Sequence, residues 1–179
     1  HSLMEARKKM TTGFIMLYSD ILFEDNIMSK MLTCQEDIVL VVDNTMQYHA
    51  PEANKIQDFI ISKNKHLTTR RKINFACENI VSKIGSKLNT ETATHEFIGL
   101  AKFTKTGAEQ LLQTYEDCIK NYHGKLQEAD SINQFKFTDL IQEMIDRGYV
   151  VNFLEIHKGW LEIHSTEDIE LANHFLSKS

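Results

Sequence analysis

The chain has 179 residues, of which 42% are hydrophobic and 25% are charged, a composition typical of a globular protein with one buried core. Its longest apolar run, residues 13–18, is far shorter than the roughly 18 residues that a membrane-spanning helix needs, which excludes a membrane span. The net charge of −5 at pH 7 gives no general attraction to phosphate backbones and disfavours nucleic acid as the main partner.

The cysteines and the N-terminus indicate a cellular compartment. Cys34, Cys77 and Cys118 are odd in number and widely spaced, which argues against a disulfide framework and against a thiolate metal site. No basic region followed by an apolar stretch marks a secretory signal. We therefore expect a cytoplasmic protein that forms one domain over residues 1–179.

The N-terminal part contains two short, continuous apolar runs, residues 14–18 (FIMLY) and 38–42 (IVLVV). An aspartate follows each run, Asp20 after the first and Asp43 after the second. Such runs are typical of strands that are covered on both faces. Residues 25–32, between them, carry apolar side chains at helical spacing, so the order predicts a βαβ unit with a right-handed crossover.

The middle of the chain is less regular. Charges dominate residues 51–72 and predict an excursion at the surface, although residues 59–61 are compatible with a short strand. Residues 81–88 and 95–103 predict two further extended segments. Gly99, in the middle of the second one, permits close approach of another backbone or of a ligand.

The C-terminal part predicts three helices and one strand. Thr106 opens an amphipathic helix, and Thr138 is a candidate cap for a second helix that ends at Gly148. Residues 150–156 predict a strand, and residues 165–168 (STED) resemble a capping box that begins the last helix. We expect this last helix to bury Ile169, Ala172, Phe175 and Leu176. The whole pattern predicts an α/β fold with a mixed, mostly parallel sheet and helices on both faces.

Three stretches of the sequence together carry a resemblance to a known family. They are residues 13–23 (GFIMLYSDILF), 93–107 (ATHEFIGLAKFTKTG) and 138–172 (TDLIQEMIDRGYVVNFLEIHKGWLEIHSTEDIELA). In order and spacing they resemble the cytidylyltransferase-type sugar-nucleotidyltransferase domain that is associated with phosphoenolpyruvate phosphomutase, and the related choline-phosphate cytidylyltransferases of bacteria. The resemblance implies a nucleotide-diphospho-sugar transferase fold.

The family's opening segment has no counterpart in this sequence. Members of the family begin with a glycine-rich loop that contains an arginine and, soon after, a lysine, and that wraps the nucleotide triphosphate. Here Arg7, Lys8 and Lys9 stand without glycines. We therefore expect the chain to match only the C-terminal part of the family domain, without its N-terminal strands, and to have little or no activity alone. A sheet that lacks those strands exposes an edge, so we expect a homo-oligomer such as a dimer, or packing against the missing segment.

Three residues are candidates for a metal site. The resemblance implies that Asp20 holds the Mg²⁺ that bridges the triphosphate and the attacking phosphate; capping of a helix or turn by Asp20 is the alternative. The family's second metal-binding aspartate follows a Trp-x-Glu-Ile motif, here residues 160–163, and the position is occupied by His164. Imidazole suits zinc and other transition ions better than Mg²⁺. Either Glu162 compensates, or His164 acts through water, or metal-dependent catalysis is impaired; a histidine without function at a strand end also remains open.

Further residues are candidates for binding the acceptor. The resemblance implies that Glu96 contacts hydroxyl or ammonium groups of the acceptor; a solvent-facing strand residue is the alternative. Relatives tend to carry an Ile-Gly-Lys motif for the acceptor phosphate, and because residues 84–86 read Ile-Gly-Ser here, Lys87 is a candidate substitute. Trp160 either lines a pocket or packs in the core.

Two functions follow from this reading. The resemblance implies an Mg²⁺-dependent enzyme that transfers a nucleotidyl group, cytidylyl in this family, from its triphosphate to a phosphorylated or phosphonate-bearing small molecule. The alternative is a non-catalytic binding or assembly module derived from such an enzyme. His164 and the absent loop favour the module, whereas Asp20 and Glu96 favour the enzyme.

Overall fold

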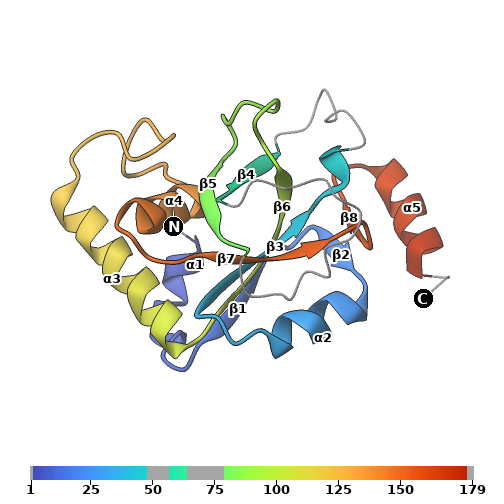
Figure 1. The fold of residues 1–179 in the computed structure, drawn as a ribbon, viewed down its shortest axis with the longest axis horizontal. Coiled ribbons are helices and arrows are strands. Elements are labelled where there is room, and N and C mark those ends of the chain that lie inside the picture. The colour runs from blue at the N-terminus through green and yellow to red at the C-terminus, as the bar shows by residue number, and fades with distance from the viewer. Residues whose placement is uncertain (1, 48–56, 64–78, 177–179) are drawn as a thin grey trace.

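The computed structural model describes residues 2–47, 57–63 and 79–176 (Figure 1). Two 3₁₀ turns lie at Arg7–Lys9 and Thr45–Gln47. The helices are α1 (Ser2–Glu5), α2 (Asp25–Thr33), α3 (Lys105–Asn121), α4 (Phe137–Asp146) and α5 (Thr166–Leu176). The strands are β1 (Phe14–Leu17), β2 (Ile21–Phe23), β3 (Ile38–Asp43), β4 (Asp58–Ser62), β5 (Val81–Gly85), β6 (His95–Phe103), β7 (Asn152–Ile156) and β8 (Trp160–Glu162).

A six-stranded mixed sheet forms the centre of the molecule. Its order is β5-β4-β6-β3-β7. The sixth strand, β1, pairs with the second half of β6, along the same edge whose first half pairs with β4. Strands β1, β3, β4 and β7 run in one direction, and β5 and β6 run in the other. The predicted α/β fold with a mixed sheet is confirmed, but among the described strands of this sheet only β3 and β7 pair in parallel, so its neighbours are mostly antiparallel. Strands β1 and β3 are parallel, as the βαβ prediction requires, but β6 lies between them.

Helices cover both faces of this sheet. On one face, α3 and α4 pack against Ile38, Leu40 and Val42 of β3. On the other face, α2 packs against a second cluster that includes Val41. Successive side chains of a strand point to opposite faces, so β3, which is buried throughout, contributes to both clusters. Figure 1 shows α3 and α4 on the left and α2 on the lower right of the sheet.

Gly99 lies in the middle of β6 and allows a close contact with the residue that follows β1. Its φ is +82°, and a Cβ at this position would lie 2.4 Å from the ring of Tyr18. The N–H of Tyr18 donates a hydrogen bond of 2.9 Å to the carbonyl oxygen of Gly99. The close approach expected at this glycine is confirmed, but the atoms that occupy the space of its missing Cβ belong to the side chain of Tyr18, and the segment that carries this side chain leads directly to Asp20.

The segment predicted as a surface excursion contains a buried strand. Residues 58–62 form β4, which lies between β5 and β6, and its Phe59 and Ile60 are buried. The short strand expected at residues 59–61 is therefore confirmed, but its predicted place at the surface is wrong, because these apolar side chains pack in the core. Residues 51–56 and 64–72 of that excursion lie outside the described residues.

Two helices begin at residues other than those predicted. Thr104, not Thr106, is the N-cap of α3, and its hydroxyl accepts a hydrogen bond from the N–H of Gly107. Thr138 lies inside α4 instead of capping it; the N-cap is Lys136, whose N–H donates to the carboxylate of Asp139 at 2.7 Å. Asp139, the third helical residue, therefore binds the backbone N–H of the N-cap residue.

The predicted end of α4 and start of α5 are confirmed. Gly148 has a φ of +90°, and its N–H donates to the carbonyl of Ile145, as expected for a glycine after a helix. At α5, the Ser165 hydroxyl accepts from the N–H of Asp168, and the Asp168 carboxylate accepts from the N–H of Ser165. Ala172 is buried, but Ile169 is 49% exposed, so its predicted burial is wrong because this face of α5 meets solvent. The side chains of Phe175 and Leu176 lie outside the described part.

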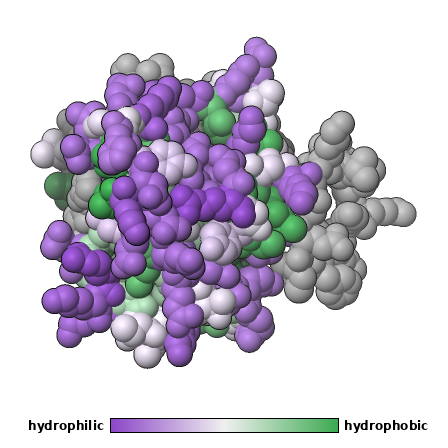
Figure 2. All heavy atoms as spheres, turned by 90° about the vertical axis from the view of Figure 1, so that its left-hand side faces the viewer, coloured by the Kyte–Doolittle hydropathy of each residue, from purple (hydrophilic) through white to green (hydrophobic). Residues whose placement is uncertain are grey.

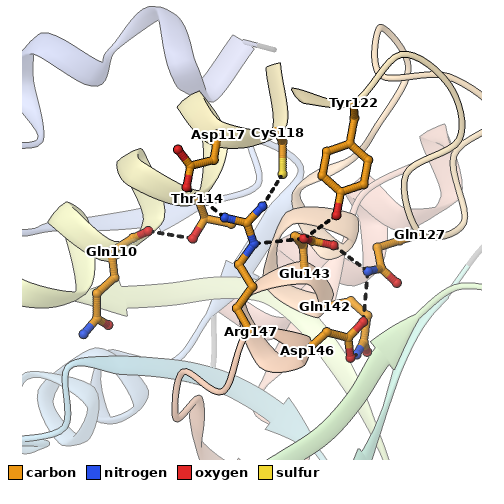
Figure 3. Close-up of polar contacts among 10 residues, drawn as sticks. All are labelled: Gln110, Thr114, Asp117, Cys118, Tyr122, Gln127, Gln142, Glu143, Asp146 and Arg147. Atoms are coloured by element: carbon orange, nitrogen blue, oxygen red, sulfur yellow. Dashed lines mark hydrogen bonds and ion pairs between the residues drawn. The ribbon is translucent and has the colours of Figure 1, made fainter. Parts of the chain in front are cut away.

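A polar network joins α3 and α4 (Figure 3). The buried carboxylate of Glu143 accepts hydrogen bonds of 2.9 Å each from Arg147, Tyr122 and Gln127. Arg147 also forms an ion pair of 3.1 Å with Asp117 of α3. Burial opposes ionisation of Glu143, but the hydrogen bonds from Arg147, Gln127 and Tyr122 outweigh it and hold the pKa of this carboxyl below its usual value. Each charge in this network therefore has a partner.

The outer face on the α3 side is mainly hydrophilic, and its apolar residues form small separate groups (Figure 2). Such a face shows no large apolar patch of the kind that marks a docking surface. Within the described ranges, no helix has the length and apolar character needed to cross a bilayer.

Candidate functional site

A two-stranded ribbon outside the main sheet brings together residues from the two ends of the chain. Strand β2 pairs with β8 in antiparallel register, with Ile21 opposite Glu162 and Phe23 opposite Trp160. The N–H of Ile163 donates a hydrogen bond of 2.7 Å to the carbonyl oxygen of Asp20, which extends the pairing by one step. The ribbon thereby places the aspartate that follows β1 beside the glutamate that ends β8.

Asp20, Glu162 and His164 form one cluster. One carboxylate oxygen of each acid and one imidazole nitrogen all lie within 4.8 Å of one another. The Nε2 atom of His164 lies 2.8 Å from Oε1 of Glu162, and the His164 side chain is 51% exposed whereas that of Glu162 is 16% exposed. The three residues predicted as metal ligands thus converge, in an arrangement open enough for an ion to enter from solvent.

The local structure contradicts helix capping by Asp20, whereas the turn-capping alternative is not contradicted. Helix α2 begins at Asp25 with Glu24 as its N-cap residue, so Asp20 does not cap it. Asp20 instead lies in the short turn between β1 and β2. His164 is also held locally, because its N–H donates a hydrogen bond of 2.9 Å to the carboxylate of Asp168.

Trp160 has one side in the core and one side in a cavity. Its ring packs against the apolar cluster on the α2 face of the sheet. Its Nε1–H donates a hydrogen bond of 2.6 Å to the carboxylate of Asp43, which is buried and also accepts from the N–H of Thr45. Asp43, the residue that follows the second predicted strand, therefore orients the indole.

A small cavity of about 30 Å³ lies beside the cluster and is lined by acids and aromatic rings. Glu96, Trp160 and Glu162, three of the residues predicted from the sequence, line it together. Tyr18, Asp58 and Gln57 complete its polar lining. The cavity is thus continuous with the metal-ligand cluster through Glu162 and places the Glu96 side chain on the same side of the sheet.

Tyr18 and Asp58 were not identified from the sequence. The Tyr18 hydroxyl donates a hydrogen bond to the Asp58 carboxylate, whose Oδ1 atom is buried and has no hydrogen-bond partner in the described part of the chain. Burial raises the pKa of Tyr18 first, and the charges of Asp58, Asp20 and Glu162 raise it further. Burial also raises the pKa of Asp58. The position of Tyr18 two residues before Asp20 was a signal that it lies near the site. Asp58 belongs to β4, and no sequence pattern reveals that β4 pairs with β6.

A larger cavity of about 630 Å³ reaches Asp20 from the other side. Tyr18 lines both cavities and separates them. The larger one is otherwise formed by β1, by α1 and by the start of α4, including Lys136 and the apolar side chains of Met16 and Phe137. Its volume falls in the range of roughly 300–1,000 Å³ that is typical of small-molecule sites.

Lys87 does not join this group. Its N–H and that of Ser86 donate hydrogen bonds of 2.9 Å to the carboxylate of Glu128, and its Nζ donates to the Glu128 carbonyl at 2.8 Å. These residues line a separate cavity together with Lys136. The structure therefore places Lys87 away from Asp20, in a loop whose N–H groups bind the carboxylate of Glu128.

Comparisons with protein families and with curated proteins find no match, whereas the fold is similar to solved nucleotidyltransferases. The inositol-1-phosphate CTP transferase from T. maritima is 18% identical, with a TM-score of 0.64 over 99% of this chain and 60% of that chain. A UDP-glucose pyrophosphorylase complexed with UDP-glucose is 15% identical, with a TM-score of 0.63 over 100% of this chain and 62% of that one. A putative glucose-1-phosphate thymidylyltransferase from Bacillus anthracis is 14% identical, with a TM-score of 0.58 over 97% and 58%.

The present chain thus spans about 60% of the length of the inositol-1-phosphate CTP transferase. At these identities the likeness shows the fold alone. The fold is sugar-nucleotidyltransferase-like, as the three sequence stretches implied.

Proposed function

We propose that this chain provides the metal site, the acceptor site and part of the nucleotide site of a nucleotidyltransferase. The observation that carries the proposal is the convergence of Asp20, Glu162 and His164 within 4.8 Å, between two cavities. The fold adds support, since the solved structures that resemble it are named as nucleotidyltransferases.

The reaction is a direct transfer. An oxygen of the acceptor's phosphate or phosphonate group bonds to the α-phosphorus of a nucleoside triphosphate. The bond from this phosphorus to the oxygen that bridges to the β-phosphorus breaks, and pyrophosphate leaves. Such a transfer needs positioning and charge stabilisation more than covalent help from the protein. A bound divalent ion supplies the neutralisation of charge on the phosphate oxygens.

The chain's own residues divide this work. Asp20 and Glu162 are the carboxylates that would hold the ion, as hard cations require. Glu96 and Asp58 offer acceptor oxygens to hydroxyl or ammonium groups of the phosphorylated molecule. The buried Oδ1 of Asp58, which has no hydrogen-bond partner among the residues that the structure describes, supports this role, because a buried acceptor without a donor is costly unless a ligand or water supplies one.

We assign the nucleotide to the larger cavity. Its apolar lining suits the base, and Lys136 and an ion held by Asp20 suit the charged phosphate chain. Cytidine triphosphate is the proposed nucleotide, on the basis of the three sequence stretches and of a structural neighbour named as a CTP transferase.

Calorimetric titration of the 179-residue chain with cytidine triphosphate, with and without a divalent ion, tests this proposal. We expect ion-dependent binding that weakens by at least about tenfold in Asp20→Asn, because loss of a ligand or its support costs roughly 10–100-fold in metal affinity. Asp130→Asn, which changes an exposed aspartate outside both cavities, is the matched control. Binding that ignores the ion, or that Asp20→Asn leaves unchanged, would contradict the proposal.

His164 favours the alternative of a non-catalytic binding module, because an imidazole replaces the carboxylate that the resemblance implies. Release of pyrophosphate separates the two functions. Ion-dependent nucleotide binding without pyrophosphate release, in the presence of a phosphorylated acceptor, identifies a binding module, whereas release that Asp20→Asn abolishes identifies an enzyme.

A further inference from the structure

The ligand atoms at the end of β1 are of two chemical kinds. Asp20 and Glu162 present carboxylate oxygens, and His164 presents an imidazole nitrogen. Mg²⁺, the ion that the resemblance implies, takes oxygen ligands in near-octahedral geometry and keeps several waters. Imidazole instead suits zinc, copper, iron and nickel. The donor set therefore fits a divalent ion, but it fits Mg²⁺ less well than it fits a transition ion.

Backbone contacts on both sides keep the imidazole in the cluster. The N–H of His164 is bound to Asp168, which belongs to the first turn of α5. The preceding N–H, that of Ile163, is bound to the carbonyl of Asp20. Between these anchors, the His164 ring already lies 2.8 Å from the Glu162 carboxylate. The two backbone anchors therefore fix the positions from which the side chains of His164 and Glu162 can reach a shared ion.

We infer that this cluster binds a first-row transition ion such as Zn²⁺ or Co²⁺ in preference to Mg²⁺, and that His164 determines the preference. The inference rests on the proposed metal site, and it specifies which ion that site selects. Its chemical basis is the substitution of one nitrogen donor into a set that would otherwise consist of oxygens. An aspartate at position 164 would restore the all-oxygen set.

Calorimetric titration of the full chain with Zn²⁺ and, separately, with Mg²⁺ measures the preference as a ratio of dissociation constants. The wild-type ratio alone is not informative, because Zn²⁺ binds most nitrogen and oxygen sites tightly. The comparison with His164→Asp is informative. We expect this variant to lower the preference for Zn²⁺ by at least about tenfold, since it removes the nitrogen and keeps the carboxylates.

His123→Asp is the matched control, because His123 is an exposed histidine that follows α3 and lies outside the cluster. It should leave the preference unchanged. The visible absorption spectrum of bound Co²⁺ gives an independent readout. We expect the Co²⁺ bands to change in His164→Asp and to remain as in the wild type in His123→Asp, without any assay of nucleotidyl transfer.

An unchanged ion preference in His164→Asp, or an equal change in His123→Asp, overturns the inference. Asp20→Asn then distinguishes a failure of the ion selectivity from a failure of the proposed metal site. If Asp20→Asn abolishes ion binding while His164→Asp leaves the preference unchanged, the selectivity claim fails and the metal site remains. If Asp20→Asn also leaves ion binding unchanged, the selectivity claim and the proposed site fail together.

Discussion

Carboxylates gather at two places in this molecule, between α3 and α4 and at the end of β1, and their surroundings differ. Glu143, in the first group, is buried and receives hydrogen bonds from a guanidinium, a phenol and an amide. In the second group, Asp20, Asp58 and Glu162 lie close enough for their charges to raise the pKa of Tyr18 together. The Oδ1 atom of Asp58 has no donor within the described residues.

The difference separates acids whose charge is balanced within the chain from acids that, on the proposed function, a bound cation would balance. A buried carboxylate that is fully hydrogen-bonded has its charge balanced within the chain. Acids placed near one another raise the free energy of the unliganded fold, unless a cation or a hydrogen-bond donor arrives from outside. Figure 3 shows the first arrangement, in which every dashed contact is between residues of the chain itself.

The largest expected effect is at the α3–α4 network. Arg147→Ala leaves the buried Glu143 carboxylate with only Tyr122 and Gln127 as donors, so we expect the free energy of unfolding to fall by about 3 kcal/mol. Denaturant unfolding measures it. Lys105→Ala is the matched control, because Lys105 also pairs with a glutamate four residues away, Glu109, but the pair is exposed and 3.9 Å apart. Equal effects of the two changes would erase the distinction between the two groups.

A pH dependence provides the next test. The folded pKa of Glu143 is lowered, so its contribution is fully present above the unfolded value of about 4.3 and is lost as the pH falls through the folded value. Glu143→Gln should therefore lower the stability by roughly 2 kcal/mol at neutral pH, as loss of hydrogen bonds to a charged group implies. The difference from the wild type should shrink as the pH falls below 4.3. A difference that stays constant on acidification would show that the charge of Glu143 does not matter.

The smallest expected effect is at the end of β1. Without added ions, Asp20→Asn should change the free energy of unfolding by no more than about 0.5 kcal/mol, in the direction of a gain, because it removes one of several like charges. Thermal unfolding in the presence of a chelator measures this change. A loss larger than about 1 kcal/mol would place Asp20 with Glu143 among the acids that hold the fold.

The sequence was informative wherever an element is long and apolar. The run that became β3 is buried on both faces, as expected, and the apolar spacing that became α2 and α3 reflects burial on one face. The same expectation is wrong for the run that became β1, because Ile15 and Leu17 are exposed on one face of that edge strand. The start of α5 was also predictable, because a capping box depends only on neighbouring residues. Thr138 was misassigned, since a preference for threonine at helix caps does not reveal that Asp139 serves the N–H of Lys136 instead.

The candidate site was predictable only in part. The resemblance pointed to Asp20, Glu162 and His164, but the ribbon that unites them consists of three-residue strands, which are too short to show periodicity. Asp58 could not have been found, because its place beside the site depends on the pairing of β4 with β6. Lys87 was plausible from spacing alone, and only the fold shows its loop bound to Glu128.

The β2–β8 ribbon has a consequence for the order in which the molecule is assembled. Its two strands come from opposite ends of the chain, and closing so large a loop costs entropy that only a few backbone hydrogen bonds offset. During synthesis, Asp20 leaves the ribosome long before Glu162, so the site is among the last features to form. The ion of the proposed site, bound across this late closure, would stabilise the closed ribbon by mass action.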